Sequence, residues 1–188
     1  MNADGAELLF VRHGQTAENA GGRILGRRDP PLSPEGHEQA ARLAKRAAGA
    51  GVAAIWTSPL QRARQTAAAV AEAVGSEPFV LDDLIESDRG RWEGQSLAHL
   101  AKVSPRLFAA FEAADPEFAF PGGESLQDQV QRTRRALGTV AGGPLPALVV
   151  AHVGTIRAAM LALGNRPPPE RAVAHGELIR MWWPAPGR

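Results

Sequence analysis

The chain has 188 residues, 44% of them hydrophobic, and no cysteine. This suits one compact domain held together by packing, and it excludes disulfides and zinc–thiolate centres because no thiol is present. The 21 basic and 20 acidic residues give a formal charge of +1, which offers no strong field for nucleic acid or an anionic membrane. The N-terminus has neither the pattern of a signal peptide nor the length of a membrane span, so we expect a cytoplasmic protein.

The first predicted element is an apolar strand over residues 8–11 that stops at Arg12, His13 and Gly14. In open α/β sheets ligands bind beyond the carboxyl ends of the strands, and a glycine lets the backbone approach an anion closely. A neutral imidazole is a nucleophile near pH 7, and a guanidinium presents a fork of donors to phosphate or carboxylate. Alone, however, such a histidine is usually structural, and such an arginine is as often paired with an acid.

Two helices and a second strand are predicted next. A glycine-rich basic loop over 21–31 leads to a helix that Ser33 should cap, since proline and glutamate follow it. A strand over 53–57 precedes a second helix, for which Ser58 is the expected N-cap and Gly75 the end.

The second helix offers a further cation. With Ser58 as the cap, Arg62 lies in the first turn, where free backbone amides and the helix dipole favour an anion. Arg64 is two positions further on and does not share that face, so we expect it in solvent. A short strand over 79–81 follows, and Glu86 just beyond it is the candidate acid, although a carboxylate there is more often a surface group.

The middle of the chain is less regular. We expect a short helical cap region over about 95–122, with one helix starting at Ser96 and another at Ser104. A loop holding Phe118 and Phe120 should follow. Aromatic residues in such a place are more often core than part of a substrate site.

Regular elements return in the last third of the chain. They are a helix over 126–140, a strand over 148–151 that ends at His152, a helix over 155–163 and a last strand over 178–183. This alternation predicts a single domain, 1–188, with an α/β fold: a three-layer α/β/α sandwich around a mostly parallel sheet that allows an antiparallel edge strand. His152 and Gly154 repeat the plan of His13 and Gly14, so both histidines could share one pocket.

Several ordered blocks together resemble the histidine phosphatase superfamily, the phosphoglycerate mutase-like proteins. The blocks are Arg12-His13-Gly14-Gln15-Thr16 with Asn19, then Gly26 and Asp29, then Ser58-Pro59-Leu60-Gln61-Arg62-Ala63, then Glu86 with Gly90 and Trp92-Glu93-Gly94, then Pro121-Gly122-Gly123-Glu124-Ser125, and His152-Val153-Gly154-Thr155-Ile156-Arg157. They cover most of the chain. The small phosphatases that act on α-ribazole phosphate or sugar phosphates look alike in these blocks.

The resemblance implies hydrolysis of a small-molecule phosphomonoester without a metal or cofactor. His13 would attack phosphorus and become phosphorylated, while Arg12, Arg62 and His152 hold the equatorial oxygens. Glu86 would protonate the leaving oxygen and then deprotonate the attacking water; beside a bound phosphate its pKa should rise towards that of a general acid. The expected substrate-binding residues are Asn19, Gln15, Thr16, Gly26 and Val153.

Two other functions stay open. A phosphoglycerate mutase of this kind carries Glu-Arg-x-Tyr-Gly where this chain has Glu86-Ser87-Asp88-Arg89-Gly90, and this chain has no tyrosine. An inactive phosphate-binding interaction protein commonly lacks one of the catalytic groups, and here all are present. Zinc binding is disfavoured because His13 and His152 have no third ligand at a metal-binding spacing.

The sequence leaves substrate and assembly undecided. Candidate walls of the cleft are Arg23, Arg27, Arg28, Arg89, Trp92, Phe118 and Phe120, each more often solvated or part of the core. Trp182 and Trp183 on the predicted edge strand suit an interface or ordinary core equally. We expect a monomer or a homodimer.

Overall fold

The structure, a computed structural model, describes residues 5–184. Its strands are β1 (Gly5–Arg12), β2 (Ala54–Thr57), β3 (Phe79–Val80), β4 (Ala147–Ala151) and β5 (Leu178–Pro184). Its α-helices are α1 (Ala17–Ala20), α2 (Pro34–Ala48), α3 (Gln61–Val74), α4 (Leu97–Val103), α5 (Pro105–Ala113), α6 (Leu126–Ala141) and α7 (Val153–Ala162). Short 3₁₀ turns lie at Asp82–Leu84, Gly90–Trp92 and Glu170–Ala172.

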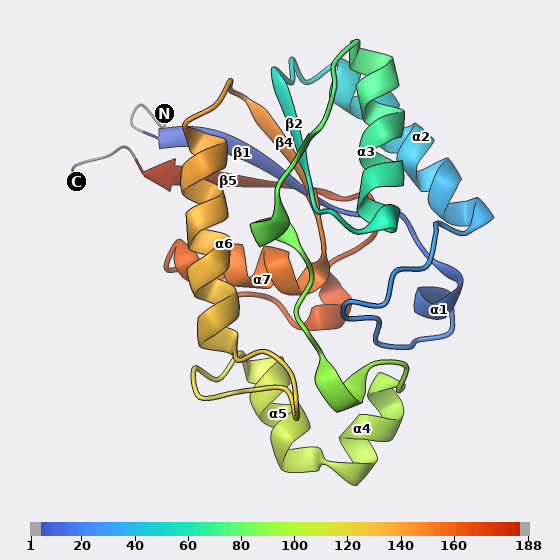
Figure 1. Ribbon diagram of the computed structural model, residues 1–188, viewed down its shortest axis with the longest axis vertical. Helices are drawn as coiled ribbons and strands as arrows, with labels where there is room; N and C mark the ends of the chain where they lie inside the picture. The colour runs from blue at the N-terminus through green and yellow to red at the C-terminus, as the bar shows by residue number, and fades with distance from the viewer. Residues whose placement is uncertain (1–4, 185–188) are drawn as a thin grey trace.

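The strands form one sheet in the order β3-β2-β4-β1-β5. The first four are parallel, and β5 pairs antiparallel with β1 at the edge. Helices α2 and α3 cover one face of the sheet, and α6 and α7 cover the other (Figure 1). The predicted three-layer sandwich with a mostly parallel sheet and an antiparallel edge strand is therefore confirmed.

Strand β1 shows why the sheet needs a layer on each side. Its alternate residues Leu8 and Phe10 pack in the cluster under α6 and α7, whereas Leu9 and Val11 pack in the cluster under α2 and α3. All four are at most 3% exposed. Burying each such side chain stabilises the fold by about 1.5–3 kcal/mol, so the central strand is anchored on both faces.

The carboxyl ends of the central strands meet at one edge of the sheet. Arg12 pairs with Ala151, and the amide of His13 donates to the Ala151 carbonyl at 3.0 Å. Thr57, the last residue of β2, pairs with Val150 of β4. The residues that directly follow β1, β2 and β4 are therefore neighbours.

Two serines predicted as helix caps have different roles. Ser33 caps α2 as expected, accepting from the Gly36 amide at 3.1 Å. The assignment of Ser58 as a cap was wrong: α3 begins at Gln61, its N-cap Leu60 makes no side-chain cap bond, and Asp29 accepts from the Gln61 amide at 2.7 Å. The Ser58 hydroxyl contacts a histidine of the site instead.

Helices α4 and α5, which lie between β3 and α6 in the chain, are beyond the carboxyl ends of the strands (Figure 1). Helices α4 and α5 begin near the predicted starts, and Ser96 caps α4 by accepting from the His99 amide at 3.1 Å. A separate apolar cluster lies under these helices and includes Trp92, Phe118 and Phe120. These three aromatic residues are core, at most 5% exposed, and do not form a wall of the cleft.

The lengths and hydropathy of the helices test for a membrane span. No helix within residues 5–184 is both long and apolar enough to cross a bilayer.

Candidate active site

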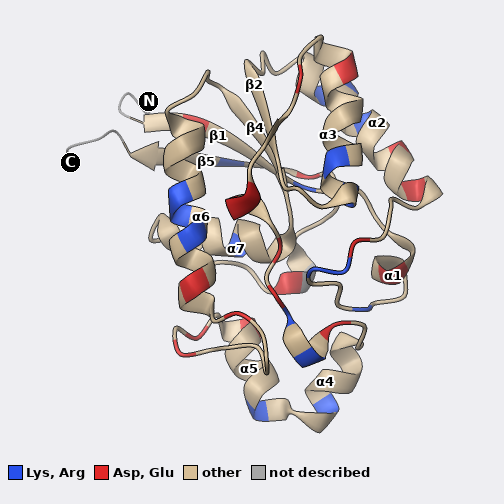
Figure 2. Ribbon diagram, viewed as in Figure 1, with Lys and Arg blue, Asp and Glu red and all other residues tan. Residues whose placement is uncertain are grey.

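A cleft of about 500 Å³ opens at the carboxyl ends of the strands. Its lining includes Arg12, His13, Gln15, Asn19, Arg23, Gly26, Arg62, Glu86, Arg89, Ser96, Val153, Glu170 and His175. Basic and acidic segments lie side by side around this end of the sheet, on the loop next to α1 and on the irregular chain between β3 and α4 (Figure 2). The cleft therefore combines cations for an anion with carboxylates for proton transfer.

His13 has one ring nitrogen free to react. Its Nδ1 lies 2.7 Å from the carbonyl of Gly14, which can only accept, so Nδ1 carries the proton. The Nε2 lone pair then accepts from Nε of Arg62 at 3.2 Å. Burial, followed by the neighbouring His152 and Arg62, holds the pKa of His13 well below its usual value. The imidazole is therefore neutral at physiological pH, with Nε2 as its nucleophilic atom.

The backbone beside His13 needs glycines. A Cβ on Gly14 would collide with the carbonyl oxygen of Gly36 at the start of α2, and one on Gly36 would collide with the carbonyl of Gln15. The turn after His13 therefore packs directly on the helix backbone. In addition, the Gly14 amide donates to the Thr66 hydroxyl at 3.0 Å, which ties the turn to α3.

Arg62 is held rigidly although it lies on the cleft. Its guanidinium donates to the Arg28 carbonyl at 2.6 Å and to the Gly26 carbonyl at 2.9 Å, besides the bond to His13. The side chain is 1% exposed, and burial lowers its pKa to about 10, which leaves it charged at neutral pH. Arg64, by contrast, is exposed, as its position on the helix predicts.

Arg12 and His175 form the opposite side of the His13 site. Arg12 donates to the Val173 carbonyl at 2.8 Å, while its buried Nε has no partner within the described part of the chain. His175 donates from Nδ1 to the His13 carbonyl at 2.7 Å, and the two rings are 5.5 Å apart. Burial and then Arg12 lower the pKa of His175 to about 4, so it too is neutral.

Glu86 is buried and heavily hydrogen-bonded. One carboxylate oxygen accepts from the Ser87 amide at 2.7 Å, and the other accepts from the Gly154 amide at 3.2 Å and from Arg89 at 3.3 Å. Burial alone would raise the pKa of Glu86, but Arg89 and these amide donors lower it to about 2. The rise expected from the sequence applies beside a bound phosphate and stays a prediction, whereas in the protein alone Arg89 and the amide donors keep Glu86 ionised.

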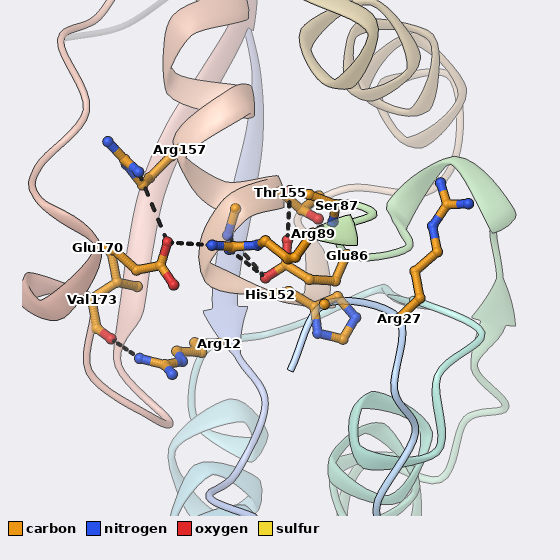
Figure 3. Close-up of polar contacts among 12 residues, drawn as sticks. Arg12, Arg27, Glu86, Ser87, Arg89, His152, Thr155, Arg157, Glu170 and Val173 are labelled. Carbon is orange, nitrogen blue, oxygen red and sulfur yellow. Dashed lines mark hydrogen bonds and ion pairs between the residues drawn. The ribbon is translucent and has the colours of Figure 1, made fainter. Parts of the chain in front are cut away.

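A buried ionic network supports Glu86 (Figure 3). Arg89 reaches Glu86 on one side and Glu170 on the other, at 3.3 and 2.8 Å. Its guanidinium lies 4.9 Å above the ring of Phe120, and Arg157 approaches Glu170 at 3.9 Å. The two carboxylates outweigh burial and raise the pKa of Arg89. Glu86 is thereby fixed in place and kept ionised.

His152 lies deeper than His13. It is the N-cap residue of α7 and fully buried, and it is not part of the cleft lining, although the two ring centroids are 5.0 Å apart. Its Nε2 is 2.7 Å from the Ser58 hydroxyl, and its Nδ1 is buried without a partner among the described residues. Burial and then Arg62 hold the pKa of His152 well below its usual value.

Residues 8–181 match the histidine phosphatase superfamily, branch 1. The chain belongs to this superfamily. A bifunctional protein of Mycobacterium tuberculosis is 40% identical over 80% of this chain, which spans only 42% of that protein. Phosphoserine phosphatase 1 of Hydrogenobacter thermophilus is 33% identical over 84% of this chain and 75% of its own length.

Solved structures of similar proteins have the same fold as this chain. A mycobacterial glucosyl-3-phosphoglycerate phosphatase complexed with VO3 superposes with a TM-score of 0.81 at 28% identity, over 96% of this chain and 99% of the other. A phosphoglycerate mutase of Thermus thermophilus has a TM-score of 0.76 at 36% identity, over 95% and 94%. The relatives thus include phosphatases and a mutase, and none of these four names is an α-ribazole phosphatase.

In this member of the superfamily, most of the catalytic and substrate-binding residues predicted from the sequence line the cleft. The exceptions are His152, which is fully buried and outside the lining, and Thr16, which is buried as the N-cap of α1 and accepts from the Asn19 amide at 3.2 Å. Of the candidate wall arginines, Arg23 and Arg89 line the cleft, and Arg27 and Arg28 do not.

The sequence reading missed two cleft residues, His175 and Glu170. Neither follows a parallel strand: Glu170 lies in a 3₁₀ turn, and His175 precedes the antiparallel β5. The signal that could have found them is weak, a histidine and an acid in the irregular segment before the last strand. Within residues 5–184 no group of three or more histidine, aspartate or glutamate side chains is arranged to hold a metal ion.

Proposed function

We propose that the protein hydrolyses a small-molecule phosphomonoester through a phosphohistidine on Nε2 of His13, without a metal or cofactor. The observation that carries this proposal is the pair of bonds on His13. Nδ1–H donates to the Gly14 carbonyl, which leaves Nε2 unprotonated beside the guanidinium groups of Arg62 and Arg12. A neutral nucleophile surrounded by fixed cations is what transfer of a phosphoryl dianion requires.

In the first step the Nε2–P bond would form as the ester P–O bond breaks. Arg62 would shift its Nε–H from the lone pair of Nε2 to a phosphoryl oxygen, and Arg12 and Asn19 would donate to the same group. The leaving oxygen would take a proton from Glu86. In the second step Glu86 would accept a proton from water, whose oxygen bonds to phosphorus as the Nε2–P bond breaks.

The ionised Glu86 requires that one proton enter with the substrate. With a pKa of about 2, Glu86 carries no proton in the free enzyme at neutral pH. A phosphomonoester has a second pKa of about 6, so its monoanion can bring the proton that Glu86 then delivers. Beside the bound phosphate the negative charge disfavours the carboxylate form, which raises the pKa of Glu86 only during the reaction.

The test of the proposal is covalent trapping. Brief incubation with a radiolabelled phosphomonoester, followed by alkaline denaturation, should leave acid-labile phosphate on the wild type and none on His13→Ala. The control is His37→Ala, an exposed histidine on α2 that should keep the label. If wild type binds phosphate but never carries label, the protein is a phosphate-binding module and the proposal is wrong.

A phosphoglycerate mutase is the second candidate, favoured by the similarity to the Thermus enzyme. In the part of the chain that the structure describes, Arg89 is the arginine next to Glu86, and it already bonds Glu86 and Glu170. It is therefore not free to bind the carboxylate of a phosphoglycerate. Turnover of 3-phosphoglycerate to its 2-isomer, stimulated by the bisphosphate, would establish the mutase, whereas release of inorganic phosphate alone supports the phosphatase.

The cleft wall should select the substrate. Its outer part is built from the backbone of Gly21 and Gly22, the side chain of Arg23 and the first residues of α4 in the proposed cap region. Ratios of kcat/KM for phosphoserine, glucosyl-3-phosphoglycerate, sugar phosphates and α-ribazole phosphate would rank the leaving groups. The same measurements in size-resolved samples would show whether a monomer or a homodimer acts.

A further inference from the structure

Ser58 is a buried hydroxyl at the end of β2 that the proposed steps do not use. It is 0% exposed, and its Oγ lies 2.7 Å from Nε2 of His152. The same oxygen accepts from the amide of Leu60 at 3.3 Å. The hydroxyl thus links a backbone amide to the second histidine of the site.

These contacts decide which group donates. The Leu60 amide can only donate, so it takes a lone pair of Ser58 Oγ. Among the contacts of residues 5–184, His152 Nε2 is then the acceptor available to the Ser58 proton. A neutral imidazole has one proton, and if Nε2 accepts, that proton is on Nδ1.

The opposite arrangement satisfies fewer buried groups. If His152 donated from Nε2 to Ser58, the Ser58 proton would lack an acceptor and the Nδ1 lone pair would lack a donor. With Ser58 as donor, Nδ1–H alone is unpartnered. Because an unpaired buried polar group is destabilising, the arrangement with one such group is favoured.

The unpartnered Nδ1 of His152 is not isolated. Arg12 Nε is also buried without a partner in the described structure, and Arg12 lines the cleft beside His13. The ring of His152 is 5.0 Å from that of His13. Unpaired hydrogen-bond donors close to His13 could stabilise the negative charge of a phosphoryl group attached to it.

We propose that Ser58 is a positioning residue that fixes the proton of His152 on Nδ1, so that this neutral imidazole offers a donor to the phosphoryl group on His13. The identity of the acceptor rests on the proposed function, whereas the tautomer does not. Burial and Arg62 hold the pKa of His152 well below its usual value, which keeps the ring in the singly protonated form that has a tautomer to fix.

The experiment is nitrogen-15 NMR of the full chain labelled at histidine, with His152 assigned by comparison with His152→Gln. In the wild type we expect a protonated Nδ1 and an unprotonated Nε2. In Ser58→Ala the proton should move largely to Nε2, and kcat/KM for a phosphomonoester should fall about 100-fold, as on loss of one transition-state donor. The matched control Thr57→Val removes the neighbouring buried hydroxyl, which donates to the Ser58 carbonyl at 3.2 Å, and should change neither.

A wild-type His152 protonated on Nε2, or a Ser58→Ala protein that keeps the proton on Nδ1, would overturn the proposal. The wild-type spectrum decides the tautomer even if Ser58→Ala does not fold. A protein with the expected tautomer that never forms phosphohistidine would refute the proposed function and still support the role of Ser58 in fixing the proton.

Discussion

The floor and the outer wall of the cleft are built differently. On the floor of the cleft, His13, Arg62 and Glu86 are each at most 4% exposed and fixed by hydrogen bonds to neighbouring backbone and side-chain groups. On the outer wall, Arg23 is exposed, and its side chain has one hydrogen bond within residues 5–184, to the Gly94 carbonyl at 2.7 Å. Residues with one rigid position suit chemistry, whereas exposed loop residues suit the choice of substrate, and the substitutions below test that division.

The largest effect should come from Glu86. Glu86→Gln removes the proton donor, so kcat/KM for an alkyl phosphate should fall by about 10²–10⁴-fold. An aryl phosphate, whose leaving group needs no proton, should lose much less activity. The comparison is made by phosphate release from both substrates, with the exposed Glu38→Gln on α2 as control. Equal losses on both substrates would show that Glu86 holds the site together and does not donate a proton.

The next largest effect is a fall in kcat/KM as the pH rises. Since free Glu86 has a pKa of about 2, the transition state holds one proton more than free enzyme and substrate dianion. Above the second pKa of the substrate, about 6, kcat/KM should therefore fall about tenfold per pH unit. Rates between pH 5 and 9 measure the slope. A flat profile to pH 8 would mean that another group supplies the proton.

The neutral histidines of the floor should make the fold sensitive to acid. His13, His152 and His175 have lowered pKa values, the last about 4, whereas in the unfolded chain they titrate near 6.5. Below about pH 6.5 the unfolded state binds more protons, so the unfolding free energy falls as pH falls, by about 1.4 kcal/mol per pH unit for each proton.

Urea denaturation from pH 7 to 4.5 measures that loss of stability. His175→Gln should reduce the slope of the unfolding free energy against pH by the contribution of about one proton, because glutamine does not titrate. The exposed His37→Gln should leave it unchanged. A stability independent of pH in this range would contradict the buried, neutral state of the three rings.

The smallest effect belongs to the outer wall. Arg23→Ala should raise KM by about tenfold or less and leave kcat unchanged, because an exposed arginine contributes only a modest interaction with the substrate. Exposed Arg42 on α2, away from the cleft, provides the control Arg42→Ala. A loss in kcat comparable to that of Glu86→Gln would mean that the wall takes part in the chemistry.

The positions of the elements and of the main reactive side chains could be predicted from the sequence. Apolar periodicity and caps such as Ser33 located the helices, and the carboxyl ends of parallel strands necessarily meet, which brought His13 and His152 to one edge. Arg62 followed from its place in the first turn of α3. These features depend on short stretches of sequence, so they can be predicted before the fold is known.

The charge and proton location of those side chains depend on the packed fold and could not be predicted from local patterns. The pKa of Glu86 depends on Arg89, which Glu170 holds from 81 residues away, and the partner of the Ser58 hydroxyl lies 94 residues away. His175 reaches His13 from an irregular segment with no signal of its own. Charge and proton location depend on distances between segments remote in the chain, and those distances exist only once the layers have packed.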